Sequence, residues 1–219
     1  MINEILEKHE TTIDEVKHVY YNNNADSQML FISFAGMIDK YVSITWFYNQ
    51  SNILGHFLFL KNDPEYTTYN ETKYETLIEY YIKKYLIKKI IIYGVSMGGI
   101  ASIKYGLKFN SDLIIAIDPS PINYDIIELL TMIKSYDNNF NYKNKIYINY
   151  TFENNLQTIP THTEQIIKEL QLKNFITIIH PFCSTKHLAF IPSKEFLIEI
   201  IEKFTTINIR SYTDTNKWF

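Results

Sequence analysis

Ser96 lies at the centre of residues 94–98, which read Gly-Val-Ser-Met-Gly, between a strongly apolar run and a segment with helical character. The chain has only six glycines, and three of them, Gly94, Gly98 and Gly99, surround this serine. Because glycine permits tight turns and close approach of neighbouring backbone, its concentration here predicts a forced turn. A Gly-x-Ser-x-Gly turn between a strand and a helix lifts the serine hydroxyl above the sheet edge, where it can act as a nucleophile.

A serine is a poor nucleophile at neutral pH and needs an adjacent base. Two of the six histidines, His180 and His187, lie at the expected sheet edge that also carries the serine turn. His187 lies in a loop from which an imidazole can reach over Ser96, whereas His180 closes the last expected strand and equally suits a structural role. We predict His187 as the base and keep His180, or no catalytic histidine, as alternatives. The other histidines precede the sheet or begin a strand or helix: His9, His18, His56 and His162.

The base in turn needs a carboxylate that accepts its hydrogen bond and stabilises the imidazolium. Glu153 follows the expected strand at 145–150 and lies between Ser96 and His187 in the chain. Asp118 follows the preceding strand and satisfies the same order, although an aspartate before a proline also suits a turn. We predict Glu153 as the acid and keep Asp118 as the alternative.

A tetrahedral intermediate also needs two hydrogen-bond donors for its oxyanion. The backbone N–H of Met97, the residue after the serine, is the first candidate. The second is expected in the loop after strand 29–34, where Gly36 permits close backbone approach. We therefore predict the N–H of Gly36 or of Met37 as the second donor, with a simple turn at Gly36 as the alternative.

The elements that would position these residues alternate along the chain. Strands are expected at 16–21, 29–34, 56–60, 89–93, 113–117, 145–150 and 175–180. Helices are expected at 2–10, 72–86, 99–107, 124–135, 162–172 and 192–204. This alternation predicts an α/β fold with a mostly parallel sheet of about six to seven strands and helices on both faces. All the candidate residues then lie beyond the carboxyl ends of strands, where such sheets carry their reactive groups.

Length and composition favour a single globular domain. The chain has 219 residues, 46% hydrophobic and 21% charged, with a net charge of −3. We expect one domain over 1–219, with its core at about 16–205 and a tail at 206–219. The mild acidity gives no electrostatic case for nucleic acid. The single cysteine, Cys183, and an N-terminus with acids where a secretory signal has bases lead us to expect a cytoplasmic protein without a transmembrane segment.

Over about 16–205 the chain resembles the α/β-hydrolase-fold superfamily. The resemblance rests on the 94–98 turn and on His187-Leu188-Ala189-Phe190-Ile191-Pro192 before the last helix. It implies the order nucleophile, acid, histidine, which Ser96, Glu153 and His187 satisfy. The sequence departs from the family pattern in two places. Thr151-Phe152-Glu153-Asn154 stands in place of Gly-x-x-Asp, and Ala35-Gly36 stands in place of His-Gly.

The resemblance implies serine-dependent acyl transfer through an acyl-enzyme, with an esterase or thioesterase acting on a small acyl ester or thioester as the first expectation. The alternative is an O-acetyltransferase that modifies a bacterial surface polysaccharide and uses acetyl-CoA as the acyl donor. A second alternative is a non-catalytic binding or assembly protein. No resident cofactor or metal is expected. The segment that contains helix 124–135 is long enough for a minimal lid at most. The terminal Trp218-Phe219 is a candidate oligomer contact.

Overall fold

The computed structural model describes most of the chain, including every expected strand. The described residues are 2–36, 41, 43–48, 55–61, 69, 72–120, 125–137, 142, 144–152, 162–183 and 193–206.

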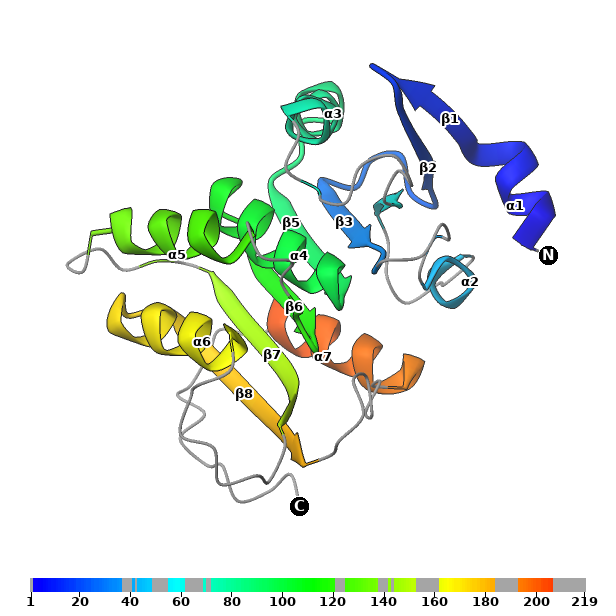
Figure 1. Ribbon diagram of the computed structural model, residues 1–219. Coiled ribbons are helices and arrows are strands. Elements are labelled where there is room, and N and C mark those ends of the chain that lie inside the picture. The colour runs from blue at the N-terminus through cyan, green and yellow to red at the C-terminus, as the bar shows by residue number, and fades with distance from the viewer. Residues whose placement is uncertain are drawn as a thin grey trace.

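One sheet runs through the whole molecule (Figure 1). Its eight described strands follow the order β1-β2-β4-β3-β5-β6-β7-β8. They are β1 Glu10–Ile13, β2 Val16–Asn22, β3 Met29–Phe34, β4 His56–Leu60, β5 Lys89–Val95, β6 Leu113–Ile117, β7 Lys145–Phe152 and β8 Ile176–Cys183. Only β2 runs against the others, since it pairs antiparallel with both β1 and β4. The mostly parallel α/β architecture is therefore confirmed, with one strand more than predicted.

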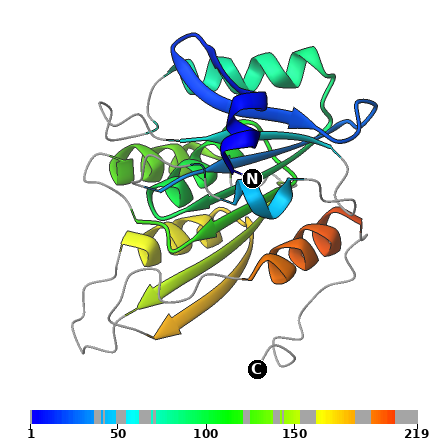
Figure 2. The same cartoon turned by 90° about the vertical axis from the view of Figure 1, so that its right-hand side faces the viewer.

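Seven described helices cover both faces of this sheet. They are α1 Ile2–His9, α2 Ile44–Phe47, α3 Thr72–Lys84, α4 Met97–Lys108, α5 Asp125–Ser135, α6 His162–Leu172 and α7 Lys194–Thr206. Helices α1, α2 and α7 share one apolar cluster on one face, whereas α3 to α6 contribute to two clusters on the other. Figure 2 shows α7 in orange and α6 in yellow on opposite sides of the strands. Helices on both faces were predicted and are confirmed.

Strand β5, which leads to Ser96, lies inside the sheet and is buried on both of its faces. After Lys89 every residue of β5 is buried. Ile91 and Tyr93 face the cluster of α1, α2 and α7, whereas Ile90 and Ile92 face the cluster of α3 and α4. A parallel strand covered on both faces is expected to be such a continuous apolar run.

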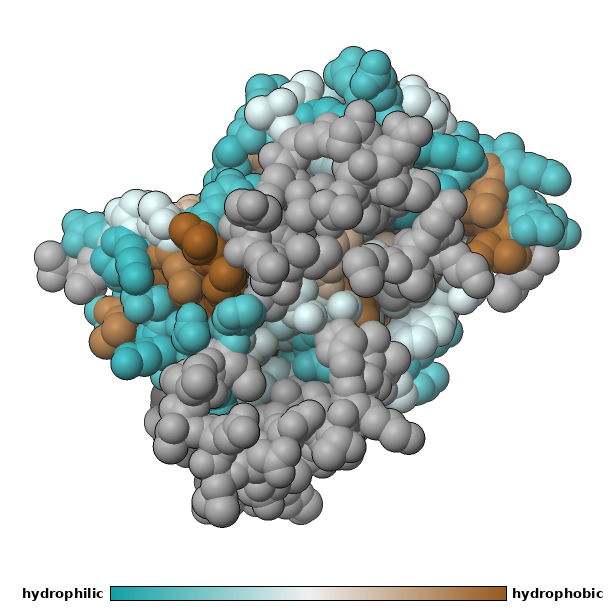
Figure 3. All heavy atoms as spheres, in the orientation of Figure 1, coloured by the Kyte–Doolittle hydropathy of each residue, from teal (hydrophilic) through white to brown (hydrophobic). Residues whose placement is uncertain are grey.

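Helix α5, between β6 and β7, lies on the sheet. Ile126, Leu129 and Ile133 are buried in the cluster under it, and Ile127 is 67% exposed on its outer side. Apolar side chains gather over this helix on the surface seen in Figure 3. In the described part of the chain, α5 therefore acts as ordinary sheet covering. No described helix is long and apolar enough to cross a membrane.

Two short elements differ from the prediction. The strand β1 and the single-turn helix α2 were not expected from the sequence. The last strand also continues past His180 to Cys183, so His180 lies inside β8 and does not close it.

Candidate functional site

Ser96 occupies the turn between β5 and α4 in a backbone conformation that ordinary residues avoid. Its φ is 56° and its ψ is −122°, outside the main regions allowed to L-residues. Its N–H donates to the Ile117 carbonyl at 2.8 Å, at the end of the neighbouring strand β6. Ser96 is partly exposed, whereas all its neighbours from Ile90 to Ile103 are buried. The predicted strand–turn–helix is present, and it places this one side chain at the surface.

The glycines around Ser96 are needed because other backbone lies against them. A Cβ on Gly94 would overlap the Gly98 carbonyl, and a Cβ on Gly98 would overlap the carbonyls of Phe34 and Ala35. Helix α4 can therefore begin directly over β5 and against the end of β3 only with glycine at both positions.

Gly36 brings the loop after β3 against the serine. A Cβ on Gly36 would lie 3.4 Å from the Ser96 Cβ and 4.0 Å from its Oγ. Among the described residues, none accepts a hydrogen bond from the N–H of Gly36 or from that of Met97. Met97 follows Ser96 directly and Gly36 lies against it, so the N–H groups of these two residues remain the predicted oxyanion donors. Met37, the other residue predicted as a donor, lies outside the described residues.

Asp118 lies at the carboxyl end of β6 and is buried, with 5% of its surface exposed. Its φ of 44° is left-handed, a conformation that aspartate tolerates better than most residues. Its N–H donates to the Asn149 carbonyl at 2.6 Å, and the preceding Ile117 accepts from the Ser96 N–H. The structure therefore brings the Asp118 backbone beside the serine turn. The predicted acid Glu153 and the predicted base His187 lie outside the described residues.

His180, the alternative base, is held on the face of the sheet under α7. Its Nδ1 is 3.0 Å from the Tyr147 hydroxyl. Burial raises the pKa of Tyr147, so this hydroxyl stays protonated. In the parts of the chain described above, no group of three or more His, Cys, Asp or Glu side chains is placed to hold a metal ion.

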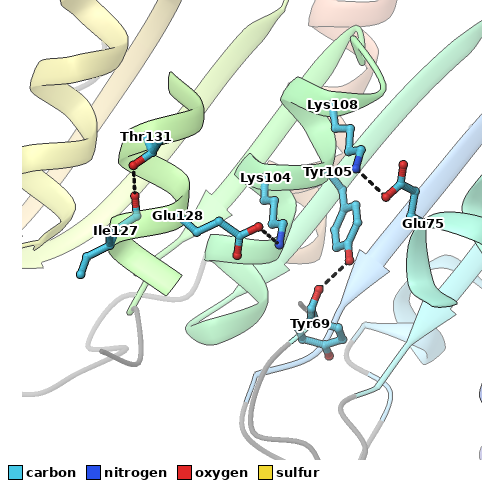
Figure 4. Close-up of polar contacts among 8 residues, drawn as sticks. All are labelled: Tyr69, Glu75, Lys104, Tyr105, Lys108, Ile127, Glu128 and Thr131. Carbon is cyan, nitrogen blue, oxygen red and sulfur yellow. Dashed lines mark hydrogen bonds and ion pairs between the residues drawn. The ribbon is translucent and has the colours of Figure 1, made fainter. Parts of the chain in front are cut away.

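Two tyrosines near the site were not predicted from the sequence. The Tyr69 hydroxyl donates to the Ala35 carbonyl at 2.9 Å, and the Tyr105 hydroxyl donates to the Tyr69 carbonyl at 2.5 Å (Figure 4). No local pattern marks them, because the chain has 18 tyrosines and each contact joins segments more than 30 residues apart.

Comparisons with known proteins bear on the fold. No protein-family model and no curated protein matches the chain. A capsule O-acetyltransferase of Neisseria meningitidis serogroup A superposes with a TM-score of 0.58 at 20% identity, over 90% of this chain and 92% of that one. MGS-MChE2, an alpha/beta hydrolase enzyme from the metagenome of lagoon sediments, gives 0.54 at 11% identity, over 90% and 97% of the two chains.

A third solved structure is much longer than this chain. The Glycosylation Associate Protein (Gap123) complex from Streptococcus agalactiae gives a TM-score of 0.55 at 13% identity, over 80% of this chain but only 42% of that chain. At these identities the comparisons show similarity of fold alone. The chain has the α/β-hydrolase fold.

Proposed function

We propose that the protein is a serine-dependent acyl-transfer enzyme with Ser96 as its nucleophile. The Ser96 Oγ bonds to an ester or thioester carbonyl carbon while its proton passes to His187. The bond to the leaving group then breaks, and the leaving group takes that proton, which leaves an acyl-enzyme. Glu153, with Asp118 as the alternative, orients His187. The N–H groups of Met97 and of Gly36 or Met37 stabilise the oxyanion.

One observation carries this proposal: the strained backbone of Ser96 beside Gly36 and Met97, whose N–H groups have no acceptor among the residues that the structure describes. A conformation outside the allowed regions costs about 1–3 kcal/mol and persists only where the surroundings enforce it. Here the surroundings are the end of β6, the first turn of α4 and the loop at Gly36. A serine that only had to turn the chain would not require this arrangement.

Water is our first choice for the group that resolves the acyl-enzyme, which makes the protein an esterase or thioesterase for a small acyl group. A sugar hydroxyl is the second choice, with acetyl-CoA as donor, a bacterial surface polysaccharide as acceptor and the cytoplasm as location. The likeness to a capsule O-acetyltransferase supports this second choice, and one structure of that enzyme is a complex with CoA.

The nucleophile is tested by covalent labelling with a fluorophosphonate probe, because an unactivated serine does not react. We expect the wild-type chain to be labelled at Ser96 and to hydrolyse p-nitrophenyl acetate, and Ser96→Ala to lose both properties. Ser102→Ala is the matched control, since Ser102 lies on α4, directly after the Ser96 turn, and its hydroxyl donates to the Gly99 carbonyl at 2.7 Å. If the wild-type chain is folded but is not labelled, the protein is a non-catalytic relative.

The acceptor is tested separately with acetyl-CoA as donor. CoA release is followed by a thiol reagent, with and without a de-O-acetylated bacterial polysaccharide. An esterase or thioesterase releases CoA at the same rate in both cases. Release that depends on the glycan, together with acetyl groups on the product, identifies a transferase.

A further inference from the structure

The peptide that joins Ala35 to Gly36 is held on its carbonyl side. The Tyr69 hydroxyl donates to the Ala35 carbonyl at 2.9 Å, and the Ala35 N–H donates to the Leu60 carbonyl at 3.0 Å. In a planar trans peptide the carbonyl and the following N–H point in opposite directions. A donor that fixes the Ala35 carbonyl therefore also fixes the direction of the Gly36 N–H.

Gly36, at the other end of this peptide, lies against the serine turn. It is buried, and a Cβ on its Cα would lie 3.2 Å from the Val95 carbonyl oxygen and 3.4 Å from the Ser96 Cβ. None of the residues that the structure describes accepts a hydrogen bond from its N–H. Nearly all buried N–H groups in proteins are paired, so a buried N–H beside a candidate nucleophile, with no acceptor in the described part of the chain, suits a ligand oxygen.

Tyr69 is itself fixed on two sides. The residue is 3% exposed. Its ring makes edge contacts with the rings of Phe34 and Tyr74, with 5.0 Å and 5.2 Å between the ring centroids. Its carbonyl accepts from the hydroxyl of Tyr105, which points at it from α4 in Figure 4. Burial raises the pKa of Tyr69 well above its ordinary value, so its hydroxyl remains a donor.

These contacts form a closed chain around the nucleophile. Helix α4 begins directly after Ser96 and carries Tyr105 more than two turns later. Tyr105 holds Tyr69, and Tyr69 holds the peptide that ends at Gly36, the residue that lies against Ser96. We propose that Tyr69, supported by Tyr105, is a positioning residue that aims the Gly36 N–H at the oxyanion of the acyl-transfer reaction. This inference rests on the proposed function and specifies how one of its two donors is held.

The alternative is that Tyr69 only satisfies a buried carbonyl. Losing its hydroxyl would then lower stability and leave the reaction unchanged. If Tyr69 positions the donor, its loss lets the peptide rotate towards other donors and weakens binding of the transition state more than binding of the substrate. Removing an oxyanion donor costs about 10²–10³ in kcat, and a misdirected donor should cost less, about 10- to 100-fold.

The test compares Tyr69→Phe and Tyr105→Phe with the wild-type chain. We expect Tyr69→Phe to lower kcat for p-nitrophenyl acetate by about 10- to 100-fold with KM within about threefold. The rate of fluorophosphonate labelling at Ser96 should fall in parallel, because that reaction also places an oxygen in the oxyanion site. Tyr105→Phe should change both rates in the same direction by a smaller factor.

Tyr81→Phe is the matched control. It removes another buried tyrosine hydroxyl, which is 2.7 Å from the Nε2 of His18, on β2. We expect it to lower the melting temperature, because it removes a buried hydrogen bond. It should change kcat by less than about twofold, because this hydrogen bond is not part of the site at Ser96. A Tyr69→Phe protein that loses stability like Tyr81→Phe but keeps the wild-type kcat and labelling rate would overturn the positioning role.

The outcomes separate this inference from the proposed function. Failure of the wild-type chain to be labelled contradicts the nucleophile, whereas labelling of wild type and Tyr69→Phe at equal rates contradicts only the role of Tyr69. If Tyr69→Phe does not fold, the test uses Tyr105→Phe. A fluorophosphonate labelling rate equal to that of the wild-type chain refutes the inference, and a slower rate supports it.

Discussion

At the scale of single residues, the site depends on how one strained serine is held. The N–H of Ser96 donates to Ile117, and its carbonyl accepts from the N–H groups of Gly99 and Ser120. All three bonds join the turn to itself or to the end of β6. Backbone hydrogen bonds thus offset the unfavourable φ of Ser96.

The choice between two carboxylates is also a residue-scale question. We expect Glu153→Gln to lower kcat for p-nitrophenyl acetate by about 10³- to 10⁴-fold, as loss of the orienting acid does in serine triads. Asp118→Asn should lower it by less than about tenfold, because asparagine tolerates the left-handed backbone found at Asp118. Steady-state kinetics of the two variants provides the measurement. Loss of turnover only in Asp118→Asn would transfer the acid role to Asp118.

The sequence permits part of this site to be predicted. Ser96 and Gly36 could be located because glycine is rare in the chain and a strand and helix flank the turn. The role of Tyr69 could not, because it depends on a hydrogen bond to a carbonyl 34 residues away. Every residue type has a backbone carbonyl, so the sequence does not indicate which carbonyl accepts the hydrogen bond from Tyr69.

At the scale of elements, long periodic segments were predictable and short ones were not. The seven expected strands and six expected helices are all present, most of them within a few residues of their predicted bounds. The strand β1 has four residues, none of them buried, so its sequence lacks the alternation that identifies a strand. Pairing with β2 makes it a strand. Helix α2 is a single turn, too short for a helical period.

Two histidine–tyrosine pairs fasten β2 to its neighbours. His18 on β2 bonds to the hydroxyl of Tyr81 on α3, and its Nδ1 is 2.8 Å from the Val16 carbonyl. His56 on β4 bonds to the hydroxyl of Tyr20 at 2.6 Å, and its Nε2 is 2.9 Å from the Ser27 carbonyl. The ring nitrogen beside each carbonyl must donate, because a carbonyl only accepts, and in the neutral imidazole the other nitrogen accepts from the tyrosine hydroxyl. Burial lowers the pKa of both histidines.

Stability should therefore fall in mild acid. A native pKa below 6.5 means that the unfolded chain binds the proton first, so the free energy of unfolding is constant above about pH 6.5 and falls as the pH decreases below it. The slope is at most about 1.4 kcal/mol per pH unit for each such histidine. Urea unfolding between pH 7.5 and 5.0 measures it. We expect a shallower slope in His18→Gln; an unchanged slope would mean that His18 does not contribute.

At the scale of the whole molecule, three apolar clusters share their elements. Strand β5 contributes to the clusters on both faces, and α4 contributes to both clusters on its own face. Helix α4 is also linked to its neighbours by Lys108 with Glu75 of α3 and by Lys104 with Glu128 of α5 (Figure 4). Ion pairs that are partly open to solvent contribute about 1 kcal/mol or less each, so the shared burial must hold the parts together.

Because these clusters share β5 and α4, we expect the chain to unfold in one cooperative transition, as a single domain does. Leu197→Ala, Leu77→Ala and Ile133→Ala each create a cavity in a different cluster, and each should lower the free energy of unfolding by about 2–5 kcal/mol. Far-UV circular dichroism reports the whole sheet, while the fluorescence of Trp46, measured in a Trp218→Phe background, reports the cluster of α1, α2 and α7, against which that side chain packs. The two signals should change at the same urea concentration in the wild-type chain and in every variant. Separate midpoints, with only one of them moved by Leu197→Ala, would show that the two faces of the sheet unfold independently.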